Sequence, residues 1–424
     1  MLNYLISRSD RMTLPRSQLT SVRLVLLICL IYGFLSTSSP DKVGLPEVAI
    51  GVLLIYLVGL RSASTLVLLM DRRGSPPYIK LLAAFLLIAP TVVGLIFYQN
   101  EFGNYIRDII PAIYIFLPVF LYDRVRKNPV VWVKTLAAGL FISGIGFTIQ
   151  YFLDPSVAMK DLVASQVHGS NRDNPWQDSA AIFAFTFSLA ASIYYLRLGK
   201  YMYSFVFLGV YGAMLVMYLS TVSRAPIGLS IAVNLITLFF AYRSARVKGY
   251  IAFVIASIIA FVFILIFSFQ FDNLLSQGFS LLLEKTESSG FLNSRDIEMI
   301  AVFKNASNPV SFLVGEGWGG LLSNPIGGGT KWRFVHNSFG YYFFKTGIIG
   351  LIGYLIYLLS ILRVFANFFS VATKRNLISI ILISAIPSLV VSLLIEPMFK
   401  AMSFGFLLTM LLALRFASAS GDMK

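Results

Sequence analysis

Apolar residues along the chain come in long blocks of about 17–25, separated by short polar segments. A helix rises about 1.5 Å per residue, so a block of about 20 residues is long enough to cross a hydrocarbon layer of roughly 30 Å. The pattern predicts an all-α polytopic membrane protein with about 12 transmembrane helices. The predicted spans are residues 24–38, 45–60, 80–98, 108–122, 130–152, 179–196, 201–221, 225–242, 249–270, 337–362, 376–395 and 399–415.

The distribution of basic residues predicts the orientation of these spans. If the N-terminus is cytoplasmic, the cytoplasmic segments hold about 21 of the 34 Lys and Arg residues, and these short loops alternate with nearly uncharged ones. The opposite orientation would leave the short cytoplasmic loops with about three Lys and Arg residues. Because Lys and Arg collect on the cytoplasmic side of membrane proteins, both termini are predicted to be cytoplasmic.

Two connections on the predicted outer side are long, at residues 153–178 and 271–336. Asn293 and Asp296 form an N-terminal cap pattern, and the residues that follow predict a short helix. On that helix Ile297, Ile300 and Ala301 fall on one face, whereas Arg295 and Glu298 fall on another. Glycines at 315–320 and 327–329 predict tight turns. We therefore predict a single membrane domain over residues 1–424, whose large loop carries a helical cap along the membrane interface.

Composition narrows the possible functions. The chain is 57% hydrophobic and only 12% charged, which agrees with a membrane protein. Its net charge of +15 comes without basic arms or zinc-ligand spacing, so nucleic-acid binding is not predicted. A single cysteine, Cys29, and two histidines argue against a disulfide framework or a metal centre, and no cofactor is predicted. Residues 1–22 are basic and polar, so the first apolar block is interpreted as a retained span rather than a signal peptide.

Two arginines at the predicted outer face are candidate ligands for an anion. Arg224 lies between two apolar spans, where it either snorkels to lipid headgroups or offers a bidentate guanidinium to phosphate. Arg295 lies near the start of the cap helix, where the helix dipole also favours anions. The alternative for Arg295 is a solvated side chain paired with Asp296 or Glu298.

A histidine at the end of the large loop is a candidate general base. His336 precedes Asn337 at the start of a predicted span, and Gly340, Phe343 and Gly347 fall on roughly the same helical face. The two glycines leave room there for a groove or for a close-packed neighbour. A histidine can accept or orient a proton near neutral pH, although a lone histidine is often structural.

Further polar residues are candidate substrate contacts. His168 and Arg172 lie in the first long loop, and Arg333 lies just before His336. A solvated loop is the alternative for the first two. Lys345 lies on the opposite face of the span from His336, and we predict that it pairs with Glu396 in the last outer turn.

Together these residues place two arginines and a histidine on one side of the membrane. This set suits a substrate whose leaving group is a lipid-linked diphosphate. The arginines would neutralise charge that develops on the diphosphate, and the histidine would accept or orient the proton of an attacking hydroxyl.

Three short motifs in this order resemble the bacterial O-antigen polymerase and O-antigen ligase superfamily. They are Ser223-Arg224 at the outer end of a span, Ser294-Arg295 followed by Gly315-Glu316-Gly317, and the segment HNSFGYYFFKTGIIG that begins at His336. The motifs cover roughly residues 180–365, and the number of spans and the large outer loop agree over the whole chain.

The resemblance implies a C-type glycosyltransferase-like fold in the bacterial inner membrane, with a periplasmic active site. It implies metal-independent transfer of glycan from an undecaprenyl-diphosphate carrier, with Arg224, Arg295 and His336 as the essential residues. Donor and acceptor would both be lipid-linked glycans, and a chain-length regulator is a further candidate partner.

The sequence leaves three activities open. The contexts GEGWGG and HNSFGYYFFKTG favour a polymerase of repeat units. A ligase that transfers finished glycan to the lipid A core uses the same donor, as does a related protein-glycosylating transferase. A transporter of anionic lipids is the rival from another class, although the chain lacks the internal repeats and interrupted spans typical of transporters.

Overall fold

The computed structural model describes residues 16–36, 44–59, 77–153, 178–220, 228, 295–306, 308–323, 331–332, 335–367, 377–395 and 397–419. The longer α-helices are α3 (Arg16–Leu35), α4 (Leu45–Val58), α6 (Pro77–Val92), α7 (Phe102–Ile115), α10 (Pro129–Leu153), α12 (Ser179–Arg197), α13 (Tyr201–Ser220), α17 (Arg295–Asn305), α19 (Ser338–Leu362), α21 (Leu377–Val390) and α22 (Met402–Ala419). The short α-helices are α8 (Leu117–Phe120), α9 (Tyr122–Lys127) and α18 (Pro309–Val314), with π- or 3-10 turns η1 (Val93–Phe97), η3 (Arg363–Asn367), η4 (Val391–Ile395) and η5 (Pro397–Lys400). Two residue pairs, β1 (Leu322–Ser323) and β2 (Lys331–Trp332), form a minimal antiparallel ladder.

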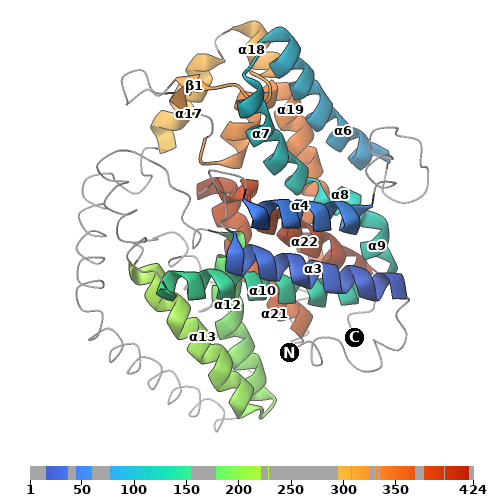
Figure 1. Ribbon diagram of the computed structural model, residues 1–424, viewed down its shortest axis with the longest axis vertical. Helices are drawn as coiled ribbons and strands as arrows, with labels where there is room; N and C mark the ends of the chain where they lie inside the picture. The colour runs from blue at the N-terminus through green and yellow to red at the C-terminus, as the bar shows by residue number, and fades with distance from the viewer. Residues whose placement is uncertain are drawn as a thin grey trace.

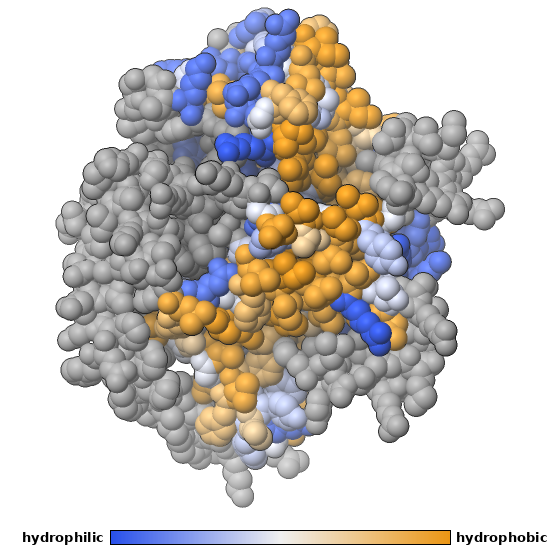
Figure 2. All heavy atoms as spheres, in the orientation of Figure 1, coloured by the Kyte–Doolittle hydropathy of each residue, from blue (hydrophilic) through white to orange (hydrophobic). Residues whose placement is uncertain are grey.

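Within these residues, 8 helices are long and apolar enough to cross a membrane, so the protein is a multi-pass membrane protein. They are Gln18–Leu35, Tyr78–Phe97, Pro129–Leu153, Ser179–Arg197, Tyr201–Tyr218, Ser338–Phe365, Leu377–Ile395 and Met402–Ala419. Each overlaps a predicted span, with the largest shift at the first, which was predicted at 24–38. Large apolar side chains on α3, α4 and α6 are exposed and form a continuous apolar surface (Figure 2). Such a surface is expected where a protein contacts lipid.

Two predicted spans form shorter helices, and two lie outside the described residues. Span 45–60 is the 14-residue helix α4. Span 108–122 is divided between α7 and α8, because the ring nitrogen of Pro118 cannot donate to the carbonyl of Tyr114. Gly405 of α22 packs close to that carbonyl, where a side chain would collide with it. Spans 225–242 and 249–270 fall on residues that the structure does not describe.

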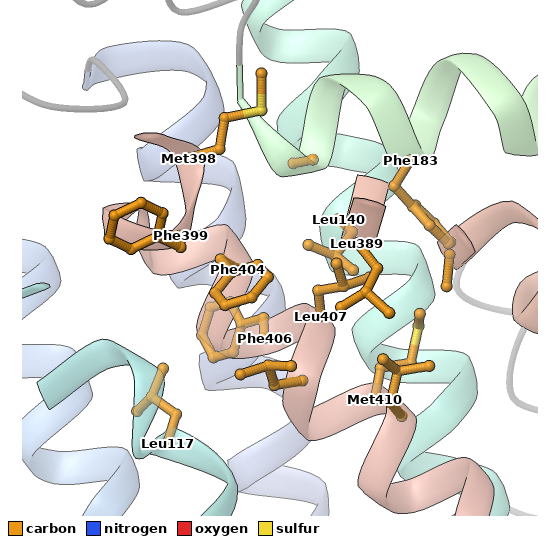
Figure 3. Packing of buried hydrophobic residues seen from close by; sticks show 14 of the residues in the cluster. Leu117, Leu140, Phe183, Leu389, Met398, Phe399, Phe404, Phe406, Leu407 and Met410 are labelled. Atoms are coloured by element: carbon orange, nitrogen blue, oxygen red, sulfur yellow. The ribbon is translucent and has the colours of Figure 1, made fainter. Parts of the chain in front are cut away.

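Helix α22 lies at the centre of the hydrophobic core. Its residues Phe404, Leu407 and Met410 are buried against Leu140 of α10 and Leu389 of α21 (Figure 3). The core continues through α3, α12 and α19 in one cluster. This cluster supports the elements that carry the polar residues described below.

The short helices of the large loop gather at one end of the molecule. Figure 1 shows α17, α18 and β1 beside the ends of α6, α7 and α19, and we call this region the cap end. Within the predicted loop 271–336, the structure describes a helix, α17, that begins at Arg295, within two residues of the predicted start. Its place along a membrane interface stays a prediction.

A buried carboxylate begins α12. Asp178 is the N-cap, accepting from the backbone N–H of Ala180 at 2.7 Å, and it also accepts from the hydroxyl of Tyr32 at 2.6 Å. Asp178 lies one residue ahead of the membrane-spanning segment Ser179–Arg197. Burial raises the pKa of its carboxyl to about 6, because desolvation disfavours the charged form.

Candidate functional site

The first turn of α19 is held by its N-cap residue. The side-chain oxygen of Asn337 accepts from the backbone N–H of Gly340 at 2.6 Å, and its amide nitrogen lies 3.2 Å from the sulfur of Met299 in α17. An asparagine N-cap satisfies a backbone donor that the helix cannot pair internally. Asn337 thus fixes where α19 begins and joins it to α17.

His336 precedes this cap and is bound by Glu298 of α17. The Nδ1 atom of His336 lies 2.6 Å from Oε1 of Glu298, and the backbone N–H of His336 donates to Oε2 at 3.1 Å. The side chains are 15% and 6% exposed, respectively. A carboxylate beside Nδ1 restricts the orientations that the imidazole ring can adopt.

This contact corrects the predicted arrangement of α17. Glu298 was expected on the polar face away from Ala301, but both are buried, whereas Ile300 is 52% exposed. The inward face of α17 therefore carries an acid, because His336 and its backbone supply partners for the carboxylate. The alternative pairing of Arg295 with Glu298 stays a prediction, because the side chain of Arg295 is not described.

The face of α19 that carries Gly340, Phe343 and Gly347 is covered by close-packed neighbours. A side-chain carbon at Gly340 would lie 2.7 Å from the sulfur of Met299, and the ring of Phe343 contacts Phe303 and Phe312. Of the two possibilities left open by the sequence, a groove or a packed neighbour, the second is correct. The cap helices α17 and α18 occupy the space that the glycines leave.

Gly347 interrupts α19 with a φ of 64°, so the expectation that no predicted span is interrupted was wrong for span 337–362. An added side chain there would lie 2.3 Å from the backbone of Leu313, so only glycine fits without a shift. The carbonyls of Phe344 and Lys345 accept instead from loop amides, those of Glu316 and Gly317, both at 2.9 Å. We call residues 315–320 the glycine loop and residues 338–346 the half-helix.

The glycine loop is buried between α19 and the end of α6. Trp318 is fully buried, and its backbone N–H donates to the carbonyl of Pro90 at 3.0 Å. The amide of Asn100 donates to the carbonyls of Glu316 and Trp318. Gly317 has a φ of 71° and approaches the backbone of Gly94 so closely that no side chain would fit. The predicted tight turns at 315–320 are thus confirmed.

A buried ion pair closes the glycine loop. Lys345 donates to Asp108 of α7 and to the carbonyl of Gly320, each at 2.5 Å. The same oxygen of Asp108 accepts from the N–H of Gly319 at 2.8 Å. The side chains of Lys345 and Asp108 are 0% and 2% exposed. The predicted partner of Lys345, Glu396, lies outside the described residues.

The remaining predicted site residues are only partly within the described chain. Arg295 is the first residue of α17, one turn ahead of Glu298, but its side chain is not described. The other predicted site residues lie outside the described ranges; they are Arg224, His168, Arg172 and Arg333. The structure therefore brings together His336, Asn337 and the helix that begins at Arg295. In the described part of the chain, no group of three or more His, Cys, Asp and Glu side chains could hold a metal ion.

Comparison with known proteins finds no protein-family model that matches the chain. A search of curated proteins likewise finds no relative.

Two acids at the cap end were not singled out from the sequence as site residues. Asp108 is the first residue of predicted span 108–122, and an ionisable residue near membrane depth is a signal of function that could have found it. Glu298 carried no such signal, because its spacing is equally typical of a solvated helix face. Only its contact with His336, 38 positions away in sequence, distinguishes it.

Proposed function

We propose that the protein is a glycosyltransferase that polymerises undecaprenyl-diphosphate-linked oligosaccharide repeat units into O-antigen or exopolysaccharide. The reaction would take place at the periplasmic face of the bacterial inner membrane, in a C-type glycosyltransferase-like fold of about 12 spans. The observation that carries the proposal is the Glu298–His336 pair, in which a carboxylate lies 2.6 Å from Nδ1 of the histidine that we assign as base.

His336 would take the proton of the attacking hydroxyl. With Nδ1 facing Glu298, Nε2 is the nitrogen that accepts this proton, and Glu298 stabilises the imidazolium that forms. The hydroxyl oxygen forms a bond to the anomeric carbon of the donor glycan. The bond from that carbon to the diphosphate oxygen breaks, and its electron pair leaves with the lipid diphosphate.

Arg295 and Arg224 would stabilise the departing diphosphate. Arg295 begins α17, so the backbone N–H groups and dipole of the helix end add to its guanidinium charge. Glu298, in the following turn of the same helix, would then fix the distance between the anion site and the base. Charge stabilisation of this kind is often the largest single contribution to catalysis.

Glycan electrophoresis of a null strain tests the proposal. The strain is complemented with wild type, His336→Ala, Arg295→Ala, or Arg107→Ala as a control that removes an exposed arginine from α7. If the protein is a polymerase, the null strain should carry lipid A core with a single repeat unit. His336→Ala and Arg295→Ala should then give no ladder, whereas Arg107→Ala should give a normal ladder.

Other outcomes identify the alternatives. Unmodified core, with long chains accumulating on the lipid carrier, would identify a ligase. A normal ladder from both His336→Ala and Arg295→Ala would refute the site assignment and favour the transporter.

A further inference from the structure

The half-helix is held at both ends by acids from other elements. At its start, Glu298 of α17 contacts His336, which precedes the cap residue. At its end, Asp108 of α7 contacts Lys345, two residues before the break at Gly347. The first contact belongs to the proposed active site, whereas the proposed chemistry does not use the second.

The second contact is a closed node of four groups. Oδ2 of Asp108 accepts from Lys345 and from the N–H of Gly319, while Lys345 also donates to the carbonyl of Gly320. The node thus connects α7, α19 and the glycine loop through one carboxylate oxygen and one ammonium group. Its geometry requires the acid on α7 and the amine on α19.

Stability alone is a weak explanation for this node. Both side chains are almost completely buried, so each charge has lost its hydration. Desolvation commonly offsets the attraction within a buried ion pair, and apolar replacement of both partners is often neutral. A buried pair instead specifies position, because its hydrogen bonds are satisfied in only one arrangement.

The position that the node specifies is that of the glycine loop in the break of α19. The loop pairs the carbonyls of Phe344 and Lys345, which the break at Gly347 removes from the helical ladder. Asn305 of α17 also donates to the side chain of Glu316, at 3.2 Å. The loop therefore joins the end of the half-helix to the helix that holds His336.

We propose that Asp108 and Lys345 are positioning residues for the His336 site, which act by holding the glycine loop in the break of α19. Without the pair, the loop leaves the break and the half-helix loses its fixed end. His336 then leaves its position against Glu298. The inference rests on the proposed function only where it assigns a catalytic consequence to that position.

Hydrogen exchange of the full-length protein in nanodiscs tests the positional part. In the double variant Asp108→Leu/Lys345→Met, both charges are removed together, so no unpaired charge is left buried. Exchange is expected to rise about tenfold or more in residues 314–321 and measurably in residues 335–341. These segments contain the hydrogen-bonded amides of Gly319 and His336. Exchange in α10 and α12 should stay at the wild-type level.

Ser192→Ala/Ser204→Ala is the matched control. It removes a buried hydrogen-bonded pair between α12 and α13, with oxygens 3.0 Å apart. Its exchange at residues 314–321 and 335–341 should equal wild type. If the double apolar variant does not fold, Asp108→Asn replaces it, because that change removes the ion pair but keeps an acceptor for Gly319. Unchanged exchange at 335–341 in the folded variant would overturn the proposal.

Elongation of lipid-linked repeat units by the same reconstituted samples tests the catalytic part. We expect kcat to fall about tenfold or more with little change in KM for the acceptor, since a misplaced base affects the chemical step. Wild-type turnover in the variant would overturn the positioning role. No elongation by wild type would refute the proposed function instead, while the exchange results would still decide whether the pair positions His336.

Discussion

The carboxylate of Glu298 contacts His336 at two points. One oxygen lies 2.6 Å from Nδ1 of the imidazole, and the other accepts from the backbone N–H at 3.1 Å. The side chain and main chain of the histidine are therefore positioned by one group from a different helix. Because Asn337 then caps α19, the orientation of the ring is fixed relative to the start of that helix.

Replacement of Glu298 by Gln should slow glycan transfer without unfolding the protein. Gln keeps the volume but removes the charge that stabilises an imidazolium, so we expect a loss of about 10- to 100-fold in kcat. His336→Ala should lose about 100-fold or more. Glu101→Gln is the control, since Glu101 is exposed and its carboxylate accepts from half-buried Asn104. Equal turnover of Glu298→Gln and Glu101→Gln would contradict the assignment.

A side chain at Gly347 should severely destabilise the protein, whereas one at Gly353 should not. Both glycines lie in α19, but Gly347 has a φ of 64° and an added carbon there would lie 2.3 Å from the backbone of Leu313. At Gly353 the same carbon would lie 3.5 Å from Leu82, an ordinary contact. We expect Gly347→Ala to cost about 2 kcal/mol or more. Gly353→Ala should be neutral or stabilising. Melting temperatures in detergent measure the difference, and similar values for the two variants would be inconsistent with the break in α19.

Asp178 should make stability depend on pH between about 4 and 6. Burial raises its folded-state pKa to about 6 from its ordinary value of 3.8, so folding favours the protonated form. The free energy of unfolding is therefore highest below about pH 4, where the carboxyl is protonated in both the folded and the unfolded state. It falls as pH rises through this range, by up to about 3 kcal/mol, and is then constant.

The variant Asp178→Asn should lack this part of the pH dependence, because the amide does not titrate. Its oxygen can still accept from the N–H of Ala180, and its nitrogen can donate to the hydroxyl oxygen of Tyr32. Thermal unfolding of wild type and variant from pH 4 to 7 measures the difference between them. Asp123→Asn, at an exposed position in α9, should reproduce the wild-type curve. Parallel curves for wild type and Asp178→Asn would exclude Asp178 as the titrating group.

Loss of the cap at Asn337 should reduce both stability and activity. Asn337→Ala removes the acceptor for Gly340 and should cost about 1 kcal/mol. It also releases the backbone beside His336, so turnover should fall. Asn337→Ser restores a capping oxygen and should recover most of both. A role limited to substrate contact predicts no recovery by Ser.

Asn308→Ala is the comparison for this cap. Asn308 is the N-cap of α18 and accepts from Val310 at 3.0 Å, in an exposed position. Asn308→Ala should lower the melting temperature by as much as Asn337→Ala or by less, and it should leave turnover near wild type. A fall in turnover as large as that of Asn337→Ala would mean that any loss of cap stability, rather than the position of His336, limits activity.

The spans and the cap were predictable because their signals are local. An apolar block such as residues 130–152 requires a membrane or a core whatever surrounds it, and α10 (Pro129–Leu153) lies where it was predicted. The glycines at 315–320 predict turns because few other residues adopt positive φ. His336 was a candidate because its residue type and its place at the end of an outer loop are both visible in the sequence.

The partners of the polar residues were not predictable in the same way. Glu298 and His336 are 38 positions apart, and Asp108 and Lys345 are 237 positions apart. Neither separation has a period or motif that links the two residues. The contact of Lys345 with Asp108 was not predicted, and the predicted partner, Glu396, lies outside the described residues. The approach of α7 to α19 is decided by other helices, because α6 and α22 each pack against both of them.

The sequence by itself determined that this is a helical membrane protein with tight turns at residues 315–320, since hydrophobic periodicity and turn chemistry act over a few residues. Only the tertiary structure decided that α19 is interrupted at Gly347, that the glycine loop occupies the break, and that His336 and Lys345 each contact a buried acid. These contacts depend on the mutual approach of α7, α17 and α19. That approach is a sum of many weak packing interactions, and no single segment of the sequence encodes it.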